Sequence, residues 1–477
     1  MQIRLHDSRR RQVVPLEPIE EGKVGIYTCG QTVYGPQHLG NMRSQLYPDL
    51  LRRVLEVAGY DVTHVVNITD VGHLTSDADT GEDKLEAAAA REGRSAEQIA
   101  EHWTNQWATD RARLNCLEPH HLPRATAYID QQVEMAKVLE AKGHAYLIDD
   151  GLYFDVSTFP RYAEFAGLDL DELEATGRVD NVAEKRHPAD FALWKLTPPG
   201  VQRLQEWDSP WGRGFPGWHL ECSVMSTDLL GERFDIHTGG IDHLRVHHTN
   251  EVAQSECVFD VHPWVNIWLH CEFLNLSGLK MSKSKGHVLV VDTLVEEGID
   301  PLAFRWFFLQ AHYRQQQTFT LEQVASAGTA MRRVVDRAVA ARDAVGGDTS
   351  GASEERTRNL RSAFWDALAD DLNAPKALAV VASVLKDRSL TDADRWSLFS
   401  DFDRALGLGL ASAVASGSAG AADAGGDVDP ELADLLARRT QARADKDWAS
   451  ADAIRDELAA RGYDVVDTPD GPQLKAR

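Results

Sequence analysis

The chain has 477 residues, of which 43% are hydrophobic and 26% are charged, and its formal net charge is −24. This length exceeds one ordinary hydrophobic core, so two to four domains are expected. The composition is that of a globular protein, and the sequence lacks a run of about 18–20 consecutive apolar residues, which argues against a membrane-spanning helix. The negative charge argues against unspecific capture of nucleic acid, because a polyanion needs a local group of cations on such a surface.

The cysteines and the first residues bear on the cellular compartment. The segment MQIRLHDSRRRQ is charged within its first few positions and lacks the apolar core of a secretion signal. We therefore expect a cytoplasmic protein that has no membrane partner. A monomer is the default expectation, since the sequence does not give the oligomeric state. The cysteines are odd in number and scattered, which argues against a disulfide framework and for reduced thiols, some of them metal ligands: Cys29, Cys116, Cys222, Cys257 and Cys271.

The first predicted elements form one βαβ unit. Lys23–Gly30 is predicted as a strand, Ser44–Tyr60 as a helix that ends near a glycine, and Asp61–Thr69 as a β-branched strand. This order indicates a parallel sheet with helices on its faces. Ligands of such sheets bind at the carboxyl ends of the strands, where Cys29 and Thr69 are expected.

The rest of the chain divides into segments of different character. Residues 80–207 show a helical pattern with loop interruptions, which we interpret as an insertion into the first domain. Arg233–Val258 returns to a strand, a glycine turn and a helix. Helical segments then extend to about Leu408, with a linker at Asp343–Glu355. Residues 411–430 are of low complexity, and two helices and a short strand are predicted for the tail.

The stretch PQHLGNMR, Pro36–Arg43, stands between the first strand and the first helix. The free N–H groups at a helix N-terminus, together with the helix dipole, bind anions. Gly40 has no side chain to block a nucleotide, and His38 and Asn41 can donate hydrogen bonds to phosphate oxygens. A turn glycine beside a surface histidine is the alternative for these residues alone.

A second motif, KMSKSKG at Lys280–Gly286, places three lysines and two serines in a short loop. Lysine charges suit a departing pyrophosphate, although a basic loop without a function is the alternative. The pair of motifs resembles the H-x-G-H/N and K-M-S-K-S signatures of the class I aminoacyl-tRNA synthetases. These enzymes activate an amino acid with ATP as an aminoacyl-adenylate and then transfer it to tRNA.

Further residues suggest a metal site, because zinc needs about four nitrogen, sulfur or carboxylate ligands. Cys29 is one candidate, and His247 and Glu251 are others, since positions i and i+4 share one helix face. His248 lies about 100° away around the helix and is expected to support the fold or to contact ATP. Helix polarity can explain each residue, so the ligand set stays open at this point. The stretch PGWHLECSVM offers three more candidates: His219, Glu221 and Cys222.

The chain resembles the cysteinyl-tRNA synthetase family over nearly its whole length. The similar stretches, in order, are YTCGQTVY, NITD, PGWHLECS, FDIHTGG, HHTNEVAQS and KMSKS. The resemblance implies activation of L-cysteine with ATP and Mg²⁺, transfer to tRNA(Cys), and no hydrolytic editing domain. It also implies one zinc ion that binds the substrate thiolate and so excludes serine. The zinc ligands at matching positions are Cys29, Cys222, His247 and Glu251.

The resemblance also assigns roles to residues around the metal. The implied ATP-binding residues are His38, Gly40, Asn41, Asp242, Lys280 and Lys283. Four of these would carry the catalysis: His38, Asn41, Lys280 and Lys283. The implied cysteine-binding residues are Gly30, Thr32, Thr69, Trp218 and His237. For the last three of these, the alternatives are a strand-end cap, a core aromatic residue and a histidine satisfied within the core.

Two segments resemble the tRNA-binding parts of the family. Phe364–Asp387 is similar to the helical anticodon-side domain, and Arg443–Gly471 is similar to the small C-terminal unit. Aspartates accept hydrogen bonds from base amino groups and tryptophan stacks on a base, although an amphipathic helix with ion pairs is the alternative. The implied anticodon contacts are Arg443, Trp448, Asp452 and Asp467.

We therefore predict an α/β fold: a Rossmann-like parallel-sheet catalytic domain with an insertion, followed by a helical anticodon-side domain and a small C-terminal domain. The expected bounds are 1–115 and 208–270 for the two catalytic halves, 116–207 for the connective insertion, 271–315 for the stem-contact region with the lysine loop, 316–410 for the helical bundle, 411–430 for the linker and 431–477 for the C-terminal domain.

One departure and three rivals accompany this interpretation. Asn67–Leu85 is a longer and more acidic loop than the NITDIDDKI of many relatives, which leaves its substrate contacts open. The first rival is a mycothiol-pathway ligase that joins cysteine to an amino sugar and lacks the anticodon-side tail. The second is an inactive, zinc-dependent RNA-binding module, which the intact phosphate motifs oppose. The third is a small nucleotidyltransferase, which has no use for the downstream half.

Overall fold

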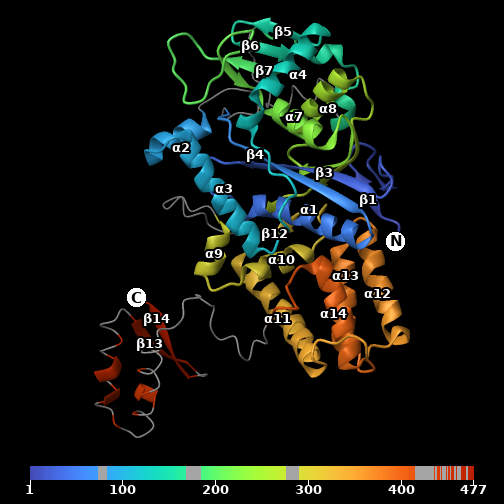
Figure 1. Ribbon diagram of the computed structural model, residues 1–477, viewed down its shortest axis with the longest axis vertical. Helices are drawn as coiled ribbons and strands as arrows, with labels where there is room; N and C mark the ends of the chain where they lie inside the picture. The colour runs from blue at the N-terminus through green and yellow to red at the C-terminus, as the bar shows by residue number, and fades with distance from the viewer. Residues whose placement is uncertain are drawn as a thin grey trace. The chain divides into compact units, whose positions relative to one another are not determined.

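The protein is described by a computed structural model that divides into two units, Met1–Ala413 and Val414–Arg477 (Figure 1). The described residues of the first unit are 1–73, 83–167, 184–275 and 289–413. In the second unit they are 435, 438–440, 442, 447, 450, 451, 453–455, 458, 463–468 and 471–476. The 74–82 part of the acidic loop and the whole KMSKSKG loop therefore lie outside the described residues, as do positions 414–430 of the expected linker.

A four-stranded parallel sheet in the order β10-β9-β3-β4 forms the centre of the first unit. Its strands are β3 (Lys23–Thr32), β4 (Asp61–Thr69), β9 (Phe234–Gly240) and β10 (Val265–Cys271). The predicted βαβ unit is confirmed, because β3 and β4 run parallel with α1 (Leu39–Val57) between them. Helix α1 begins five positions before the expected start, because the His38 side chain caps it by accepting the N–H of Asn41.

An antiparallel sheet in the order β5-β6-β7-β8 has three of its four strands in the 80–207 segment that was expected to be mainly helical, and the fourth follows that segment. Its strands are β5 (Ala145–Ile148), β6 (Gly151–Phe154), β7 (Phe191–Leu196) and β8 (Gly214–Pro216). Each has three to six residues, too few for a clear alternating pattern. Two of these strands contain a glycine, Gly151 in β6 and Gly214 in β8. A Cβ at Gly151 would lie 2.3 Å from the Trp194 carbonyl oxygen, so the close approach of the strands requires glycine there. The helical pattern of the sequence therefore did not predict this antiparallel sheet.

Helices lie beside this sheet and between it and the parallel sheet (Figure 1). Before the antiparallel sheet come α2 (Lys84–Glu92), α3 (Ala96–Arg113), the 3-10 turn η1 (Ala125–Tyr128) and α4 (Ile129–Ala141). Within and after it follow η2 (Val156–Thr158), α5 (Tyr162–Ala166), α7 (Trp218–Leu230) and α8 (His247–Phe259). Helix α8 begins at His247, which confirms the predicted strand, glycine turn and helix of this region.

The last part of the first unit is helical, as expected. Its elements are α9 (Val291–Glu296), α10 (Pro301–Leu309), α11 (Leu321–Ala344), α12 (Glu354–Ala369), α13 (Ala374–Lys386) and α14 (Asp392–Leu406). Two short strands, β11 (Leu274–Asn275) and β12 (Gln317–Thr318), pair beside α1. Figure 1 shows this bundle on the other side of α1 from the antiparallel sheet, and α14 packs against α1.

A fully buried ion pair joins α1 to this helical part. Asp49 on α1 lies 2.6 Å from Arg305 on α10, and both side chains are 1% exposed. Arg53 lies 2.8 Å from the same Asp49 oxygen, and the backbone N–H of Leu117 donates to the other oxygen at 2.7 Å. Arg305 also donates to the Leu406 carbonyl at the end of α14. The Asp49 carboxylate therefore links α1 to α10 and, through Arg305, to the end of α14.

The chain termini add two hairpins. β1 (Arg4–Asp7) pairs with β2 (Gln12–Pro15) in the first unit. In the second unit, β13 (Tyr463–Thr468) pairs antiparallel with β14 (Gly471–Ala476), so the tail ends in a two-stranded hairpin and not in the single short strand that we predicted. The helices found in the described ranges are all too short or too polar to cross a membrane.

Candidate active site and metal centre

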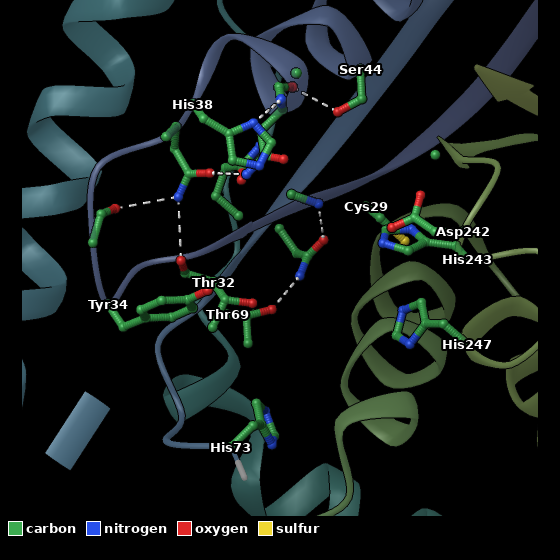
Figure 2. Close-up of a pocket in the computed structure, with 18 of the residues that line it drawn as sticks. Cys29, Thr32, Tyr34, His38, Ser44, Thr69, His73, Asp242, His243 and His247 are labelled. Carbon is green, nitrogen blue, oxygen red and sulfur yellow. Dashed lines mark hydrogen bonds between the residues drawn. The ribbon is translucent and has the colours of Figure 1, made fainter. Parts of the chain in front are cut away.

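A cavity of about 720 Å³ opens at the carboxyl ends of β3 and β4, where the sequence places the site (Figure 2). Residues from β3, the N-terminus of α1, the end of β4 and the starts of α7 and α8 line it. It brings together most of the predicted site residues: Cys29, Gly30, Thr32, His38, Gly40, Asn41, Thr69, Trp218, Cys222, Asp242 and His247. Two predicted residues, His237 and Glu251, are fully buried behind this lining.

One end of the cavity carries a cluster that suits a metal ion. One ligand atom from each of Cys29, Cys222, His247 and Glu251 lies within 4.8 Å of the others, and all four residues are buried. The Cys222 sulfur is 3.5 Å from His247 Nε2, which is 2.9 Å from Glu251 Oε1. That carboxylate oxygen takes no hydrogen bond from any described residue. Two sulfurs, an imidazole and a carboxylate are a ligand set that zinc accepts.

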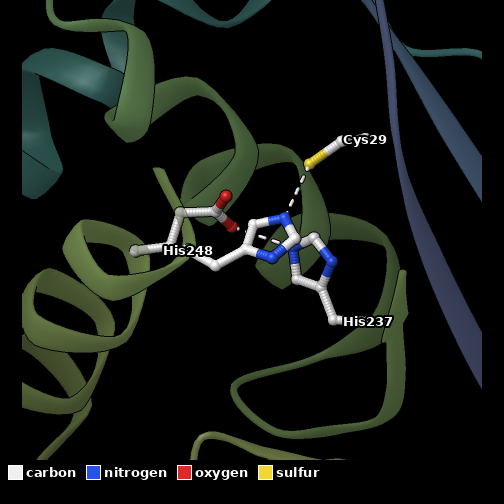
Figure 3. A group of neighbouring side chains, drawn as sticks. Cys29, His237 and His248 are labelled. Carbon is white, nitrogen blue, oxygen red and sulfur yellow. Dashed lines mark hydrogen bonds and ion pairs between the residues drawn. The ribbon is translucent and has the colours of Figure 1, made fainter. Parts of the chain in front are cut away.

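A second group shares two of these residues (Figure 3). His237 and His248 lie with Cys29 and Glu251 within the same 4.8 Å limit. His237 Nε2 is 2.9 Å from Glu251 Oε2, and His248 Nδ1 is 2.7 Å from His270 Nε2. His237 and His248 are therefore already engaged inside the fold, and neither borders the cavity. Their contacts fix the orientation of Glu251 and of the helix that carries it.

The cluster favours an ionised carboxylate. Burial by itself raises the pKa of Glu251, but the neighbouring His237 and His247 outweigh it and lower the pKa to about 2. Burial lowers the pKa of His247, and Glu251 reverses that effect and raises the pKa to about 10. A buried negative charge beside two sulfurs is the electrostatic setting in which a divalent cation is stabilised.

A hydrogen-bonded chain fixes the wall next to the metal cluster. The backbone N–H of Gly30 donates to Asn67 Oδ1 at 2.7 Å, and Asn67 Nδ2 donates to Thr69 Oγ1 at 3.1 Å, as Figure 2 shows. A Cβ on Gly30 would lie 1.5 Å from the Asn67 carbonyl oxygen, so only glycine fits. Trp218 closes the other wall by stacking on His247 with ring centroids 4.0 Å apart. The result is a small, rigid pocket.

The opposite end of the cavity, at the start of α1, has groups that can bind phosphate. His38 Nδ1 accepts the N–H of Asn41 at 3.1 Å, and Asn41 Nδ2 donates to Gln37 Oε1 at 2.7 Å. Burial lowers the pKa of His38, so the ring is neutral near pH 7. Because Nδ1 accepts, the proton sits on Nε2, which is free to donate. A Cβ on Gly40 would lie 2.9 Å from His38 Nδ1, so glycine permits this cap.

Sequence reasoning missed several residues of the site. Asn67 lies in the NITD stretch but was not recognised as the link between two pocket residues. His73 lines the cavity and its Nε2 is 2.5 Å from the buried Glu221, which the sequence offered only as a metal ligand. Tyr34 and Gln37 lie in the quoted stretches YTCGQTVY and PQHLGNMR, but no role was predicted for them. No motif marked Lys84, Arg91, Glu272 and Phe273, which also line the cavity.

Some predicted residues lie where the structure says nothing of their side chains. Lys280 and Lys283 fall in the undescribed 276–288 range, and Arg443, Trp448 and Asp452 fall in gaps of the second unit. For Asp467 only the place in strand β13 is described.

The comparison with known folds defines the class first. The structure is similar to a methionyl-tRNA synthetase of Mycobacterium tuberculosis, with a TM-score of 0.56 at 14% identity over 80% of this chain and 90% of that one. It is also similar to a LeuRS of Agrobacterium radiobacter K84, solved in a ternary complex with tRNA, with a TM-score of 0.59 at 12% identity over 83% and 85%. The fold is therefore that of the class I tRNA synthetases.

Sequence comparison then gives the family. Residues 15–329 match the model of the tRNA synthetases class I (C) catalytic domain, and residues 425–473 match the cysteinyl-tRNA ligase anticodon binding domain. The chain is 46% identical to Cysteine--tRNA ligase 1 of Burkholderia lata, over 99% of this chain and 97% of that protein. It is 40% identical to the Cysteine--tRNA ligase of Treponema denticola, over 98% of each. The chain belongs to the cysteine–tRNA ligase family, and it is an enzyme of the ligase class.

Proposed function

We propose that this chain activates L-cysteine with ATP and transfers the cysteinyl group to tRNA(Cys). One observation carries the proposal: a buried cluster of two thiols, an imidazole and a carboxylate borders the same cavity as the His38–Asn41 helix cap. A site with these two ends suits a small sulfur-containing substrate beside a nucleotide. The proposal includes a monomeric enzyme in the cytoplasm.

Cys29, Cys222, His247 and Glu251 would hold a zinc ion, which would supply a Lewis acid that prefers a thiolate to a neutral hydroxyl. This set is favoured over the group with His237 and His248, because Cys29, Cys222 and His247 border the cavity from which a substrate sulfur arrives. His237 then acts on the site by orienting the Glu251 carboxylate.

The remaining pocket residues bind and orient the amino acid. Gly30 and Thr32 lie beside the metal cysteine, where they face the substrate amine and carboxylate, and Thr69 and Trp218 limit the size of the side chain. Size alone rejects serine by only about two orders of magnitude, since oxygen and sulfur differ little in shape. The metal cluster therefore has to provide the rest of the selectivity.

Activation requires positioning and neutralisation of charge more than covalent catalysis. His38 Nε2–H and Asn41 hold phosphate oxygens of ATP–Mg²⁺ at the start of α1, and Asp242 accepts hydrogen bonds from the ribose hydroxyls. The substrate carboxylate attacks the α-phosphate, and pyrophosphate leaves toward Lys280 and Lys283, which neutralise it. In the transfer step the tRNA anticodon binds the C-terminal unit through Arg443, Trp448, Asp452 and Asp467.

The proposal predicts cysteine-dependent ATP–pyrophosphate exchange and charging of tRNA(Cys). Exchange without charging of tRNA, but with transfer of cysteine to an amino sugar, would establish the mycothiol-type ligase. Absence of exchange in zinc-replete protein would establish a binding module. The match of residues 425–473 to an anticodon-binding family opposes the amino-sugar ligase, which has no use for that unit.

A glycine variant tests the amino-acid pocket. Gly30→Ala brings a Cβ against the Asn67 carbonyl oxygen and forces β3 away from β4 at the pocket wall. We expect kcat/KM for cysteine in the exchange reaction to fall about a hundredfold, since displacements of about 1 Å have this effect. Gly351→Ala is the matched control, because its nearest neighbour would lie 3.4 Å away on the helical bundle. Equal activity of both variants would contradict the assigned wall.

A further inference from the structure

A pair of cations on helix α2 borders the cavity without any role in the functions described above. Lys84 and Arg91 both line the cavity, and because they are seven positions apart they share one helix face. Lys84 Nζ is 5.4 Å from the ring centroid of Tyr34, which also lines the cavity. We name Tyr34, Lys84 and Arg91 the basic rim.

The rim rests on a fixed scaffold. Asp83 caps α2 by accepting the N–H groups of Leu85 and Glu86, and it forms an ion pair with the half-buried Arg203. The backbone N–H of Leu204 donates to Glu86 Oε1 at 2.7 Å. The start of α2 is thereby tied to the segment just before β8. These contacts hold the start of α2, the helix that carries Lys84 and Arg91, in a fixed position.

The charges of the rim are available to a ligand. Within the described part of the chain, no carboxylate lies within 4.0 Å of the Lys84 ammonium. Among the residues that the structure describes, Arg91 pairs with its neighbour Glu92 alone, at 3.4 Å, and its side chain is 66% exposed. Lys84 and Arg91 are the lysine and arginine residues that the described part of the chain contributes to the cavity lining, which also contains Asp242 and Glu272. An anionic ligand is the chemistry they suit.

The spacing favours a chain of phosphates over the phosphates of ATP. Lys84 and Arg91 are separated by about 10 Å along the helix axis, from the rise of 1.5 Å per residue. ATP phosphates already have donors at the start of α1, in His38 and Asn41. A ligand that meets both rim cations has to run along α2 and out of the cavity. Single-stranded nucleic acid has this form, and it also carries bases.

The ring of Tyr34, next to Lys84 at the cavity, is a surface on which a base can stack. Its side chain is 36% exposed at the cavity, and the Lys84 ammonium lies against its ring. Single-stranded nucleic acids bind by stacking bases on aromatic rings beside a track of cations. Cation and ring are here in contact, so a base and the phosphate next to it can be held together.

We propose that the basic rim binds the single-stranded 3′ end of tRNA, with Lys84 and Arg91 on successive phosphates and Tyr34 against a base. This rests on the proposed function, because only a substrate whose terminal hydroxyl takes the cysteinyl group has to enter this cavity. The rim residues are then binding residues of the transfer step.

The test compares two substrates in the full-length enzyme. The double variant Lys84→Gln, Arg91→Gln is expected to raise the KM for tRNA in the charging reaction about tenfold. It should also flatten the dependence of log KM on log salt concentration by about 1.4, since each phosphate contact on a single strand contributes about 0.7. Tyr34→Leu should raise the same KM, and Tyr34→Phe should restore it, because phenylalanine keeps the ring.

Arg94→Gln is the matched control, because Arg94 lies just beyond α2, pairs with Glu92 at 3.6 Å and does not line the cavity. A rise in the KM for ATP in the exchange reaction as large as that for tRNA would assign the rim to ATP and overturn the proposal. So would an unchanged KM for tRNA, or an equal effect of Arg94→Gln. A wild-type enzyme that shows neither exchange nor charging would refute the proposed function instead.

Discussion

Replacing Cys222 by alanine is expected to abolish stoichiometric zinc binding and to reduce discrimination against serine together. The residue supplies one of the two sulfurs in the buried cluster, and its sulfur lies 3.5 Å from His247 Nε2. Without the metal, only the shape of the pocket separates cysteine from serine. We therefore expect the ratio of kcat/KM values for the two amino acids to fall to about a hundred or below. Metal analysis and pyrophosphate exchange with each amino acid measure both effects.

Cys257→Ala is the matched control for this variant. Cys257 is also a buried cysteine, but it lies on α8 away from the cavity lining and from the metal cluster. Its variant should keep both zinc and selectivity. A Cys222→Ala protein with a full complement of zinc would refute the ligand set.

Replacing Asp49 by alanine is expected to lower the free energy of unfolding by about 3–5 kcal/mol. The substitution leaves Arg305, which is 1% exposed, and the neighbouring Arg53 without their shared carboxylate, and an uncompensated buried charge has this cost. Glu354→Ala is the control, because Glu354 and Arg358 form an exposed pair at 3.3 Å. Its effect should stay within about 0.5 kcal/mol. Urea unfolding of both variants measures the difference.

The Asp49 ion pair also predicts how this difference depends on pH. Burial by itself raises the pKa of Asp49, but Arg305 and Arg53 outweigh it and hold the pKa below its ordinary value. A lowered folded-state pKa contributes stability that is complete above the unfolded pKa of about 3.9 and is lost as the pH falls through the folded value. The gap between wild type and Asp49→Ala should therefore narrow below about pH 4. A gap that widens there would contradict the assigned ion pair.

The sequence predicted the parallel core well, because its elements carry strong local signals. Strand Asp61–Thr69 has the predicted bounds, since β-branched residues fill it and its second half is buried on both faces. The start of α1 was missed because its cap is a histidine, not one of the usual capping residues. The antiparallel sheet was missed because its strands are short and pair across long stretches of chain, as Gly151 does with Lys195.

The candidate site was predicted to the extent that motifs mark it. Cys29, Cys222 and His247 come from distant stretches, yet they meet at one cavity because α7 and α8 both begin beside β3. His237 does not border the cavity, because it is fully buried and its Nε2 lies 2.9 Å from Glu251 Oε2. Asn67 lies in the NITD stretch, but its bond to Gly30 becomes visible only in the folded chain. Lys84 and Arg91 belong to no motif, and only the folded chain brings them to the cavity.

X-ray absorption at the zinc edge tests most directly whether the metal binds the substrate through sulfur. Two of the four proposed ligands are thiols, Cys29 and Cys222. The zinc enzyme alone should therefore show about two sulfur neighbours, and addition of cysteine should raise the number to about three, whereas serine should leave it unchanged. A sulfur number that stays at about two in the presence of saturating cysteine would contradict recognition by the metal.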